Sequence, residues 1–289
     1  MKYFKQFKRL LTQNPFDCLL KKSNGRTILL TWNRGLGDIP LGIYALVYRI
    51  REFIPNAEIT FLTRLDLAEG FEMLNEGKVI VDPSWKRGVP FTLSEELKEQ
   101  YDLVIENADP SQWVRWQLGK LVPKLYWKKE WDALAEKYHL QGKYLGVHVH
   151  SETTYAYEKN WNSEHWKELF EKSKNTPILL FGFSQTPIYP FDNIIDLRGK
   201  TTLFEMLSII KNHCSRLVVP DSGVLSIAYY INEAFPIKIV SLWADPKQRV
   251  LKQNVPSPNP ELKHIPLIGK NKNIHSIKVE EVYAALNEV

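Results

Sequence analysis

The chain has 289 residues, of which 44% are hydrophobic and 25% charged. This composition is typical of a globular protein with a buried core and excludes disorder over most of the chain. At roughly 150 residues per domain, the length predicts about two domains. Two cysteines are too few for a disulfide framework, and no apolar run approaches the ~18 residues that cross a bilayer. We therefore expect a protein of the reducing cytoplasm.

The net charge of +5 is concentrated at the N-terminus. Residues 1–26 contain seven basic residues and one acidic residue, Asp17, so the remainder is nearly neutral. This excludes a nucleic-acid-binding face spread over the fold. Apolar residues recur at helical spacing among the first basic ones: Phe4, Phe7, Leu10 and Leu11. Such a basic amphipathic segment either lies on an anionic membrane surface, here the inner face of the cytoplasmic membrane, or packs on the domain as a short helix.

In chain order, short β-rich runs alternate with helical patterns, which predicts βα units and parallel sheets. The first series has expected strands at 27–32, 58–62, 78–81 and 103–106 and expected helices at 41–53 and 94–100. The second has expected strands at 144–148, 177–181, 216–219 and 237–242 and expected helices at 163–172, 203–212, 224–232 and 279–287. We place the domain boundary at about residue 140, which gives domains 27–140 and 141–289.

The first candidate motif is RGLGDIP, residues 34–40, between an expected strand and an expected helix. Glycines such as Gly37 permit a tight turn and close approach of the backbone to a ligand, and a helix N-terminus attracts anions. The alternative is structural: Asp38 caps the helix and Pro40 occupies its first turn. Both interpretations remain open on the motif alone.

Two further motifs lie in the second series. In VVPDSG, residues 218–223, Ser222 and Gly223 would let a diphosphate approach the helix that follows. The alternative is an ordinary Asp/Ser helix cap. Lys159 precedes the helix at 163–172 and could neutralise phosphate charge, although a lone loop lysine is more often simply solvated.

Taken together and in order, these segments resemble glycosyltransferase family 9, the bacterial heptosyltransferases. The run Lys159-Asn160-Trp161 with the following SEHW is similar to the family's K-x-W-P-x-E-H-F segment. Further matching segments are PILLFG (177–182), IDLRGKTTL (195–203), VVPDSG (218–223), LWADP (242–246) and, in the first half, RGLGD (34–38). The similarity spans residues 28 to about 247.

The resemblance implies an α/β protein of GT-B architecture, with two Rossmann-like domains whose parallel sheets face each other across a cleft. It implies an N-terminal acceptor domain and a C-terminal domain for a nucleotide-sugar donor, ADP-heptose in the best-known members. The acceptor would be a precursor of lipopolysaccharide or another lipid-linked or oligosaccharide chain. Asp38 would be the catalytic base. Lys159, Asp221, Ser222 and Gly223 would bind the donor, and Gly37, Gly182 and Ser226 would line the donor or acceptor site.

Two positions depart from the family pattern. Ser226 stands where many members have a histidine, and Gly182 is followed by Phe183-Ser184-Gln185 where an acidic residue often holds the nucleoside. Two alternatives to an inverting glycosyltransferase therefore remain: a sugar-nucleotide epimerase of the same fold, and a non-catalytic nucleotide-sugar-binding protein.

We expect no cofactor and no metal dependence. The sequence has no D-x-D pair, the usual carboxylate ligand for a divalent cation on a diphosphate. Helix N-termini and Lys159 could stabilise a leaving diphosphate without a metal. His148 and His150 lie two residues apart at a strand end, but no cysteine or third histidine is close in sequence, which favours a polar strand end over a metal site.

Overall fold

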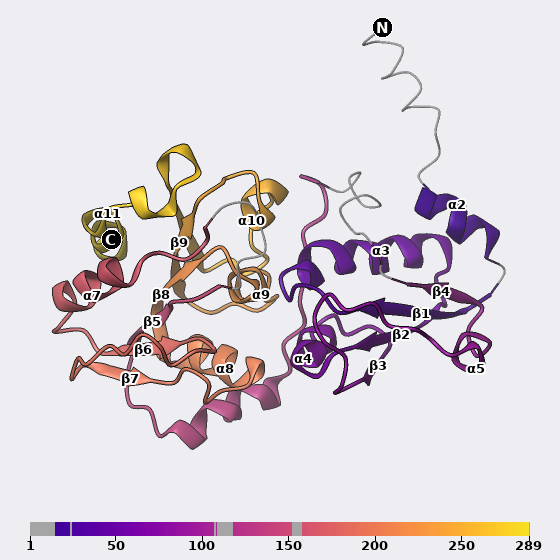
Figure 1. The fold of residues 1–289 in the computed structure, drawn as a ribbon, viewed down its shortest axis with the longest axis horizontal. Helices are drawn as coiled ribbons and strands as arrows, with labels where there is room; N and C mark the ends of the chain where they lie inside the picture. Colours follow the sequence, from indigo (N-terminus) through magenta and orange to yellow (C-terminus); the bar gives the residue numbers. More distant parts are fainter. Residues whose placement is uncertain (1–14, 24, 107, 109–117, 152–157, 289) are drawn as a thin grey trace, which may run out of the picture. The chain divides into compact units, whose positions relative to one another are not determined.

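The computed structural model describes residues 15–23, 25–106, 108, 118–151 and 158–288. Contacts divide the chain into two compact units, residues 1–121 and 122–289, each with its own parallel sheet (Figure 1). The amphipathic stretch around Phe4 to Leu11 lies outside the described residues.

The division at 121/122 differs from the expected boundary near residue 140 because η4 (Lys129–Tyr138) packs against α8 (Leu203–His213) of the second unit. Trp131 stacks on Phe204 with ring centroids 4.0 Å apart, and Lys211 donates to the Asp132 carboxylate at 2.6 Å. Residues 129–138 therefore contribute to the core of the second unit.

The first unit contains a four-stranded parallel sheet in the order β3-β2-β1-β4. The central strand β1 has the sequence TILLTW and is buried on both faces, as a strand covered by other elements on both sides must be. The elements of this unit are α2 (Pro15–Lys22), β1 (Thr27–Trp32), η1 (Ile39–Ile43), α3 (Tyr44–Phe53), β2 (Glu58–Thr63), η2 (Leu65–Leu67), α4 (Ala68–Glu72), β3 (Lys78–Val81), α5 (Glu95–Lys98) and β4 (Leu103–Ile105).

The helix α2 belongs to the first unit's core. Phe16 and Leu20 are buried, and the Asp17 carboxylate accepts from Nη2 and Nε of the Arg49 guanidinium on α3 at 2.7 and 2.8 Å. Residues 15–22, part of the basic N-terminal stretch 1–26, therefore pack on the first unit as a short helix.

The second unit contains a six-stranded parallel sheet in the order β10-β9-β8-β5-β6-β7. Numbered within the unit and read from β7, the order is 3-2-1-4-5-6, that of the Rossmann fold. Its elements are η4 (Lys129–Tyr138), β5 (Tyr144–His148), α7 (Ser163–Lys172), β6 (Ile178–Phe181), β7 (Ile194–Asp196), α8 (Leu203–His213), β8 (Cys214–Pro220), α9 (Gly223–Tyr229), β9 (Ile237–Trp243), α10 (Arg249–Gln253), β10 (Leu262–Ile268), η5 (Lys270–Lys272), η6 (Ile274–Ser276) and α11 (Val279–Asn287).

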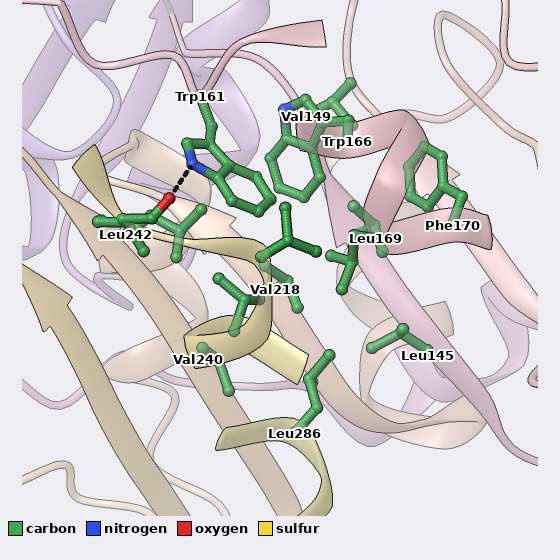
Figure 2. Close-up of a cluster of buried hydrophobic side chains, with 14 of the residues drawn as sticks. Leu145, Val149, Trp161, Trp166, Leu169, Phe170, Val218, Val240, Leu242 and Leu286 are labelled. Carbon is green, nitrogen blue, oxygen red and sulfur yellow. Dashed lines mark hydrogen bonds between the residues drawn. The ribbon is translucent and has the colours of Figure 1, made fainter. Parts of the chain in front are cut away.

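One face of this sheet packs on α7 and α11. Side chains of β5, β6, β8 and β9 meet Trp166, Leu169 and Phe170 of α7 and Leu286 of α11 in one hydrophobic cluster (Figure 2). The strand residues alternate between faces, so the intervening positions face the helices on the other side. The predicted α/β class with two parallel sheets is confirmed.

Most expected elements are present with small shifts. The strands expected at 27–32, 78–81 and 144–148 and the helices expected at 163–172 and 279–287 have the expected ends. The helix expected at 41–53 begins instead with the π-helical turn η1, and the one expected at 94–100 is reduced to α5, capped by Ser94. The sequence patterns missed α2, α4, β7, α10 and β10.

Gly77 and Gly88 provide a matched pair for testing strand packing, since both have φ of +69°. A Cβ on Gly77 would lie 2.0 Å from the Ile59 carbonyl oxygen of β2, whereas one on Gly88 meets nothing within 4 Å. We expect Gly88→Ala to lower the free energy of unfolding by about 1–2 kcal/mol, the cost of a left-handed alanine. Gly77→Ala should cost about 1–3 kcal/mol more through overpacking.

Urea unfolding of both variants measures the difference between the two sites. Equal destabilisation would show that the β2–β3 contact at Gly77 is not as tight as described.

Candidate active site

The second unit's strand order defines where a ligand would bind. In open parallel sheets, ligands occupy the crevice beyond the carboxyl ends of the strands where the strand order reverses. Here that point lies between β5 and β8, so the residues that matter follow His148 and Pro220. Asp221, Ser222 and Gly223 directly follow β8, and Lys159 belongs to the connection from β5 to α7.

Lys159 and Asp221 form a buried ion pair at this point. The Lys159 Nζ lies 2.5 Å from Asp221 Oδ2, and the two side chains are 1% and 3% exposed. The structure thus brings together two of the predicted donor-binding residues from strands that are neighbours in space. The interpretation of Lys159 as a solvated surface lysine is wrong.

The backbone around Lys159 is held by neighbouring polar groups. The Glu158 carboxylate accepts from the backbone N–H groups of Lys159 and Asn160 at 2.8 and 2.7 Å. The Asn160 side chain accepts from the Ser151 backbone N–H at 2.6 Å, and Ser151 Oγ donates to the Asp221 carbonyl at 2.9 Å. These hydrogen bonds connect the Lys159 loop to the end of β8, in addition to the ion pair between Lys159 and Asp221.

Trp161 anchors the same loop in the hydrophobic core. Its indole is buried and packs edge-on against Trp166, with ring centroids 5.0 Å apart. Its Nε1–H donates to the Ile277 carbonyl at 3.1 Å, the dashed line in Figure 2. Asn162 then caps α7 by accepting from the His165 backbone N–H. Because Trp161 is fixed two residues after Lys159, the lysine has little freedom to leave Asp221.

A second cation reaches Asp221 from a residue that the sequence patterns did not single out. Arg249, in the connection after β9, places Nε 3.1 Å from Asp221 Oδ1. Each carboxylate oxygen of Asp221 therefore faces one cation. No motif flagged Arg249, because a single arginine in a loop has no distinguishing spacing.

Ser222 and Ser226 make contacts within α9. Ser222 caps the helix by accepting from the Leu225 N–H at 3.2 Å, as the structural interpretation of the motif predicts. Ser226 is fully buried and its Oγ donates to the Ser222 carbonyl at 3.3 Å. Gly223 is the first residue of the helix. Donor contacts for these residues stay predictions.

Gly182 follows β6, the strand beside β5. Its φ of +147° lies in the region that favours glycine, and its carbonyl accepts from the Gly199 N–H at 2.8 Å. The neighbouring Phe183 is 75% exposed. Gly182 thus shapes the turn beyond β6, and a role at the donor site stays a prediction.

The histidines and the buried cysteine do not form a catalytic group. His148 is buried and His150 exposed, and burial, together with the nearby His150, lowers the pKa of His148 to about 4. Among the described residues, no cluster of three His, Cys, Asp or Glu side chains could hold a metal ion. Burial raises the pKa of the Cys214 thiol to about 12, which argues against a thiolate nucleophile.

In the first unit, Asp38 lies just beyond the carboxyl end of β1. The turn is closed by the Asp38 N–H donating to the Gly35 carbonyl at 3.2 Å, with Gly37 buried inside it. Asp38 occupies the N-cap position of η1 and Pro40 its first turn, but the Asp38 carboxylate makes no capping hydrogen bond. The half-buried carboxylate therefore does not serve as a helix cap, and π-helical turns such as η1 occur frequently at functional sites.

No protein-family model matches the chain, and comparison with curated protein sequences gives no match. Among solved structures, the chain is similar to the E. coli ADP-heptose lipopolysaccharide heptosyltransferase II, with 14% identity and a TM-score of 0.62 over 90% of this chain and 97% of that one. It is similar to a family 9 glycosyltransferase from Veillonella parvula DSM 2008, with 16% identity and a TM-score of 0.60 over 90% and 95%.

A third similar structure is the iron-containing heptosyltransferase TibC from enterotoxigenic E. coli H10407, solved with ADP-D-β-D-heptose. Identity is 12% and the TM-score 0.51, over 92% of this chain and 76% of that one. At these identities the similarity shows the fold. The chain has the fold of the family 9 glycosyltransferases, as its sequence motifs predict.

We expect Lys159→Met to lower the free energy of unfolding by up to about 3–5 kcal/mol, the cost of removing one partner of a buried ion pair. Lys167→Met, on α7, is the matched control. Lys167 pairs with Glu164 at 2.9 Å, but the two side chains are 44% and 75% exposed, so its loss should cost less than about 1 kcal/mol.

Chemical denaturation of both variants at pH 7 gives the two values. A loss below about 1 kcal/mol for Lys159→Met would contradict the description of a buried pair.

Proposed function

We propose that this protein is an inverting glycosyltransferase that moves a sugar, heptose from ADP-heptose or a related nucleotide sugar, to a lipopolysaccharide-type or other saccharide acceptor. The observation that carries the proposal is the cluster of Lys159 and Arg249 around Asp221, at the strand-order reversal of a Rossmann-type sheet. The fold shared with heptosyltransferases supports the same reaction class.

Sugar transfer from a nucleotide sugar needs positive charge near the departing diphosphate. In the second unit, Lys159 supplies this positive charge. Because its side chain is only 1% exposed, it acts on the diphosphate through its charge at short range and also holds Asp221 in position. Ser222 and Gly223 bring backbone close to the same point. We propose that these residues stabilise the leaving group without a metal ion.

Inversion at the anomeric carbon needs a base that takes the proton of the attacking acceptor hydroxyl. We assign this role to Asp38 because its carboxylate follows the glycine turn after β1 and does not cap η1. Gly37 leaves room for the acceptor to approach the backbone.

Ser226 favours one alternative, a protein that binds a nucleotide sugar without transferring it. Its hydroxyl is buried and turned to its own helix, so it offers no group at the position where the family resemblance places a histidine. Product analysis separates the possibilities. A transferase releases the nucleoside diphosphate only with an acceptor, an epimerase changes the donor alone, and a binding protein does neither.

An anionic membrane surface is the second proposed partner. None of the helices in the described parts of the chain is long and apolar enough to cross a bilayer. The membrane contact is assigned instead to the basic, aromatic sequence that precedes α2, which would bring the protein to a lipid-linked acceptor at the cytoplasmic membrane.

We expect Asp38→Asn to lower turnover by ~10²–10⁴-fold, the usual contribution of a general base, with donor affinity unchanged. Asp66→Asn is the control, because Asp66 lies just beyond β2 in the same sheet with 57% of its side chain exposed. Steady-state kinetics with titration of the donor measure both. Turnover equal to that of the parent enzyme in Asp38→Asn would exclude the assignment.

We expect removal of residues 1–14 to abolish sedimentation with anionic vesicles while preserving the fold, because α2 and its contact with α3 stay intact. Anionic lipid adds about 1 kcal/mol per basic residue near the surface, so salt should weaken binding of the full chain. Neutral vesicles are the control. If the full-length protein does not sediment with anionic vesicles at low salt, residues 1–14 have no role in membrane binding.

A further inference from the structure

The cluster around Asp221 holds more positive than negative charge. Lys159 and Arg249 each carry one positive charge, and Asp221 carries one negative charge between them. Within the residues that the structure describes, no other acidic side chain pairs with Arg249. Since uncompensated charge away from water is costly, a surplus cation at this depth favours an anionic ligand.

The three side chains differ in their access to such a ligand. Lys159 and Asp221 are 1% and 3% exposed, whereas Arg249 is 13% exposed. The lysine and the carboxylate are therefore both enclosed, and the arginine is the member of the cluster with surface left for a contact.

The Arg249 guanidinium also has unused donors. Its Nε lies 3.1 Å from Asp221 Oδ1 as an ion pair, but both Nε and Nη1 are buried with no hydrogen-bond acceptor among the described residues. A buried donor without an acceptor costs the desolvation of that group. The planar guanidinium matches phosphate oxygens in a bidentate manner, so a phosphate would satisfy the unused donors and the surplus charge together.

The backbone conformation of Arg249 beside Asp221 is energetically unfavourable. Its φ of +40° lies in the left-handed region, which disfavours residues with a Cβ. Asp245 and Pro246 precede it after β9, the strand that neighbours β8, so Arg249 enters at the same edge of the sheet as Asp221. Residues held in such conformations cluster at ligand sites.

We infer that Arg249 binds the diphosphate of the nucleotide-sugar donor directly, and that Asp221, neutralised on its other side by Lys159, positions the guanidinium. The inference rests on the proposed function and adds to it the residue that contacts the phosphates. Asp221 is then a positioning residue: its carboxylate attracts the guanidinium on the Nε side and leaves Nη1 for the ligand.

Titration calorimetry with inorganic pyrophosphate and with ADP tests the contact, since pyrophosphate reports on phosphate binding without a base or sugar. Arg249→Gln should weaken both dissociation constants about 10- to 100-fold, as expected for charge-assisted hydrogen bonds. Arg249→Lys keeps the positive charge beside Asp221 but loses the planar guanidinium that can donate two hydrogen bonds to one phosphate. This variant should therefore fold like the parent protein and bind pyrophosphate and ADP with intermediate affinity. Lys247→Gln, an exposed lysine in the same connection, should change affinity less than about twofold.

The outcomes separate this inference from the proposed function. Parent-like affinity in both Arg249 variants, or a parent protein that binds neither pyrophosphate nor ADP, would overturn the inference. Sugar transfer with an unchanged donor KM in Arg249→Gln would overturn it and leave the transferase intact. Arg249-dependent pyrophosphate binding in a protein that transfers no sugar would support it and remove the transferase. A raised donor KM with little change in kcat supports both.

Discussion

The ion pair between Lys159 and Asp221 constrains the structure of the second unit's ligand-binding edge. Taking two ions out of water costs several kcal/mol each, and this cost is offset only when the geometry is good and further partners satisfy both groups. The chain surrounds the pair with several local contacts. Trp161 fixes the lysine loop to the core, Ser151 ties it to the end of β8, and Arg249 places a second cation 3.1 Å from the other carboxylate oxygen. These contacts are present without a ligand, as the preorganised site in the proposed function requires for electrostatic stabilisation of a leaving group.

The parts of the fold that sequence reasoning predicted are those where periodicity reflects burial. β1, β5 and α7 have continuous apolar or amphipathic patterns, and their ends agree with the structure. β7 is only three residues long, and the edge strand β10, with the sequence LKHIPLI, is interrupted by lysine, histidine and proline, so neither stands out. The domain boundary shifted because η4 packs on α8 through tertiary contacts such as Asp132 with Lys211, which no local pattern encodes.

The site was predictable where a motif follows a strand and unpredictable where a contact joins distant loops. Asp221 and Ser222 lie where the strand–turn–helix pattern places them, and the capping role of Ser222 follows from its residue type. The burial of Lys159 could not be read from its neighbours, because the average loop lysine is solvated and only the tertiary position of Trp161 makes this one an exception. Arg249 is 28 residues after Asp221 in a different connection, so its contribution depends on β8 and β9 being neighbours in the sheet.

The departure from the family pattern at position 226 has a physical interpretation. Position 226, where the resemblance places a histidine, carries a hydroxyl that is enclosed in α9 and bonded to the Ser222 carbonyl, so α9 presents no side-chain cation there. In the proposed function a diphosphate needs positive charge at that edge of the sheet, and we infer that Arg249 supplies it from the start of α10, where its backbone is left-handed. An arginine keeps its charge over the whole physiological pH range, whereas a histidine would titrate within it. In the inferred site, the contact between Arg249 and the donor diphosphate would therefore keep its charge over the pH range near neutrality.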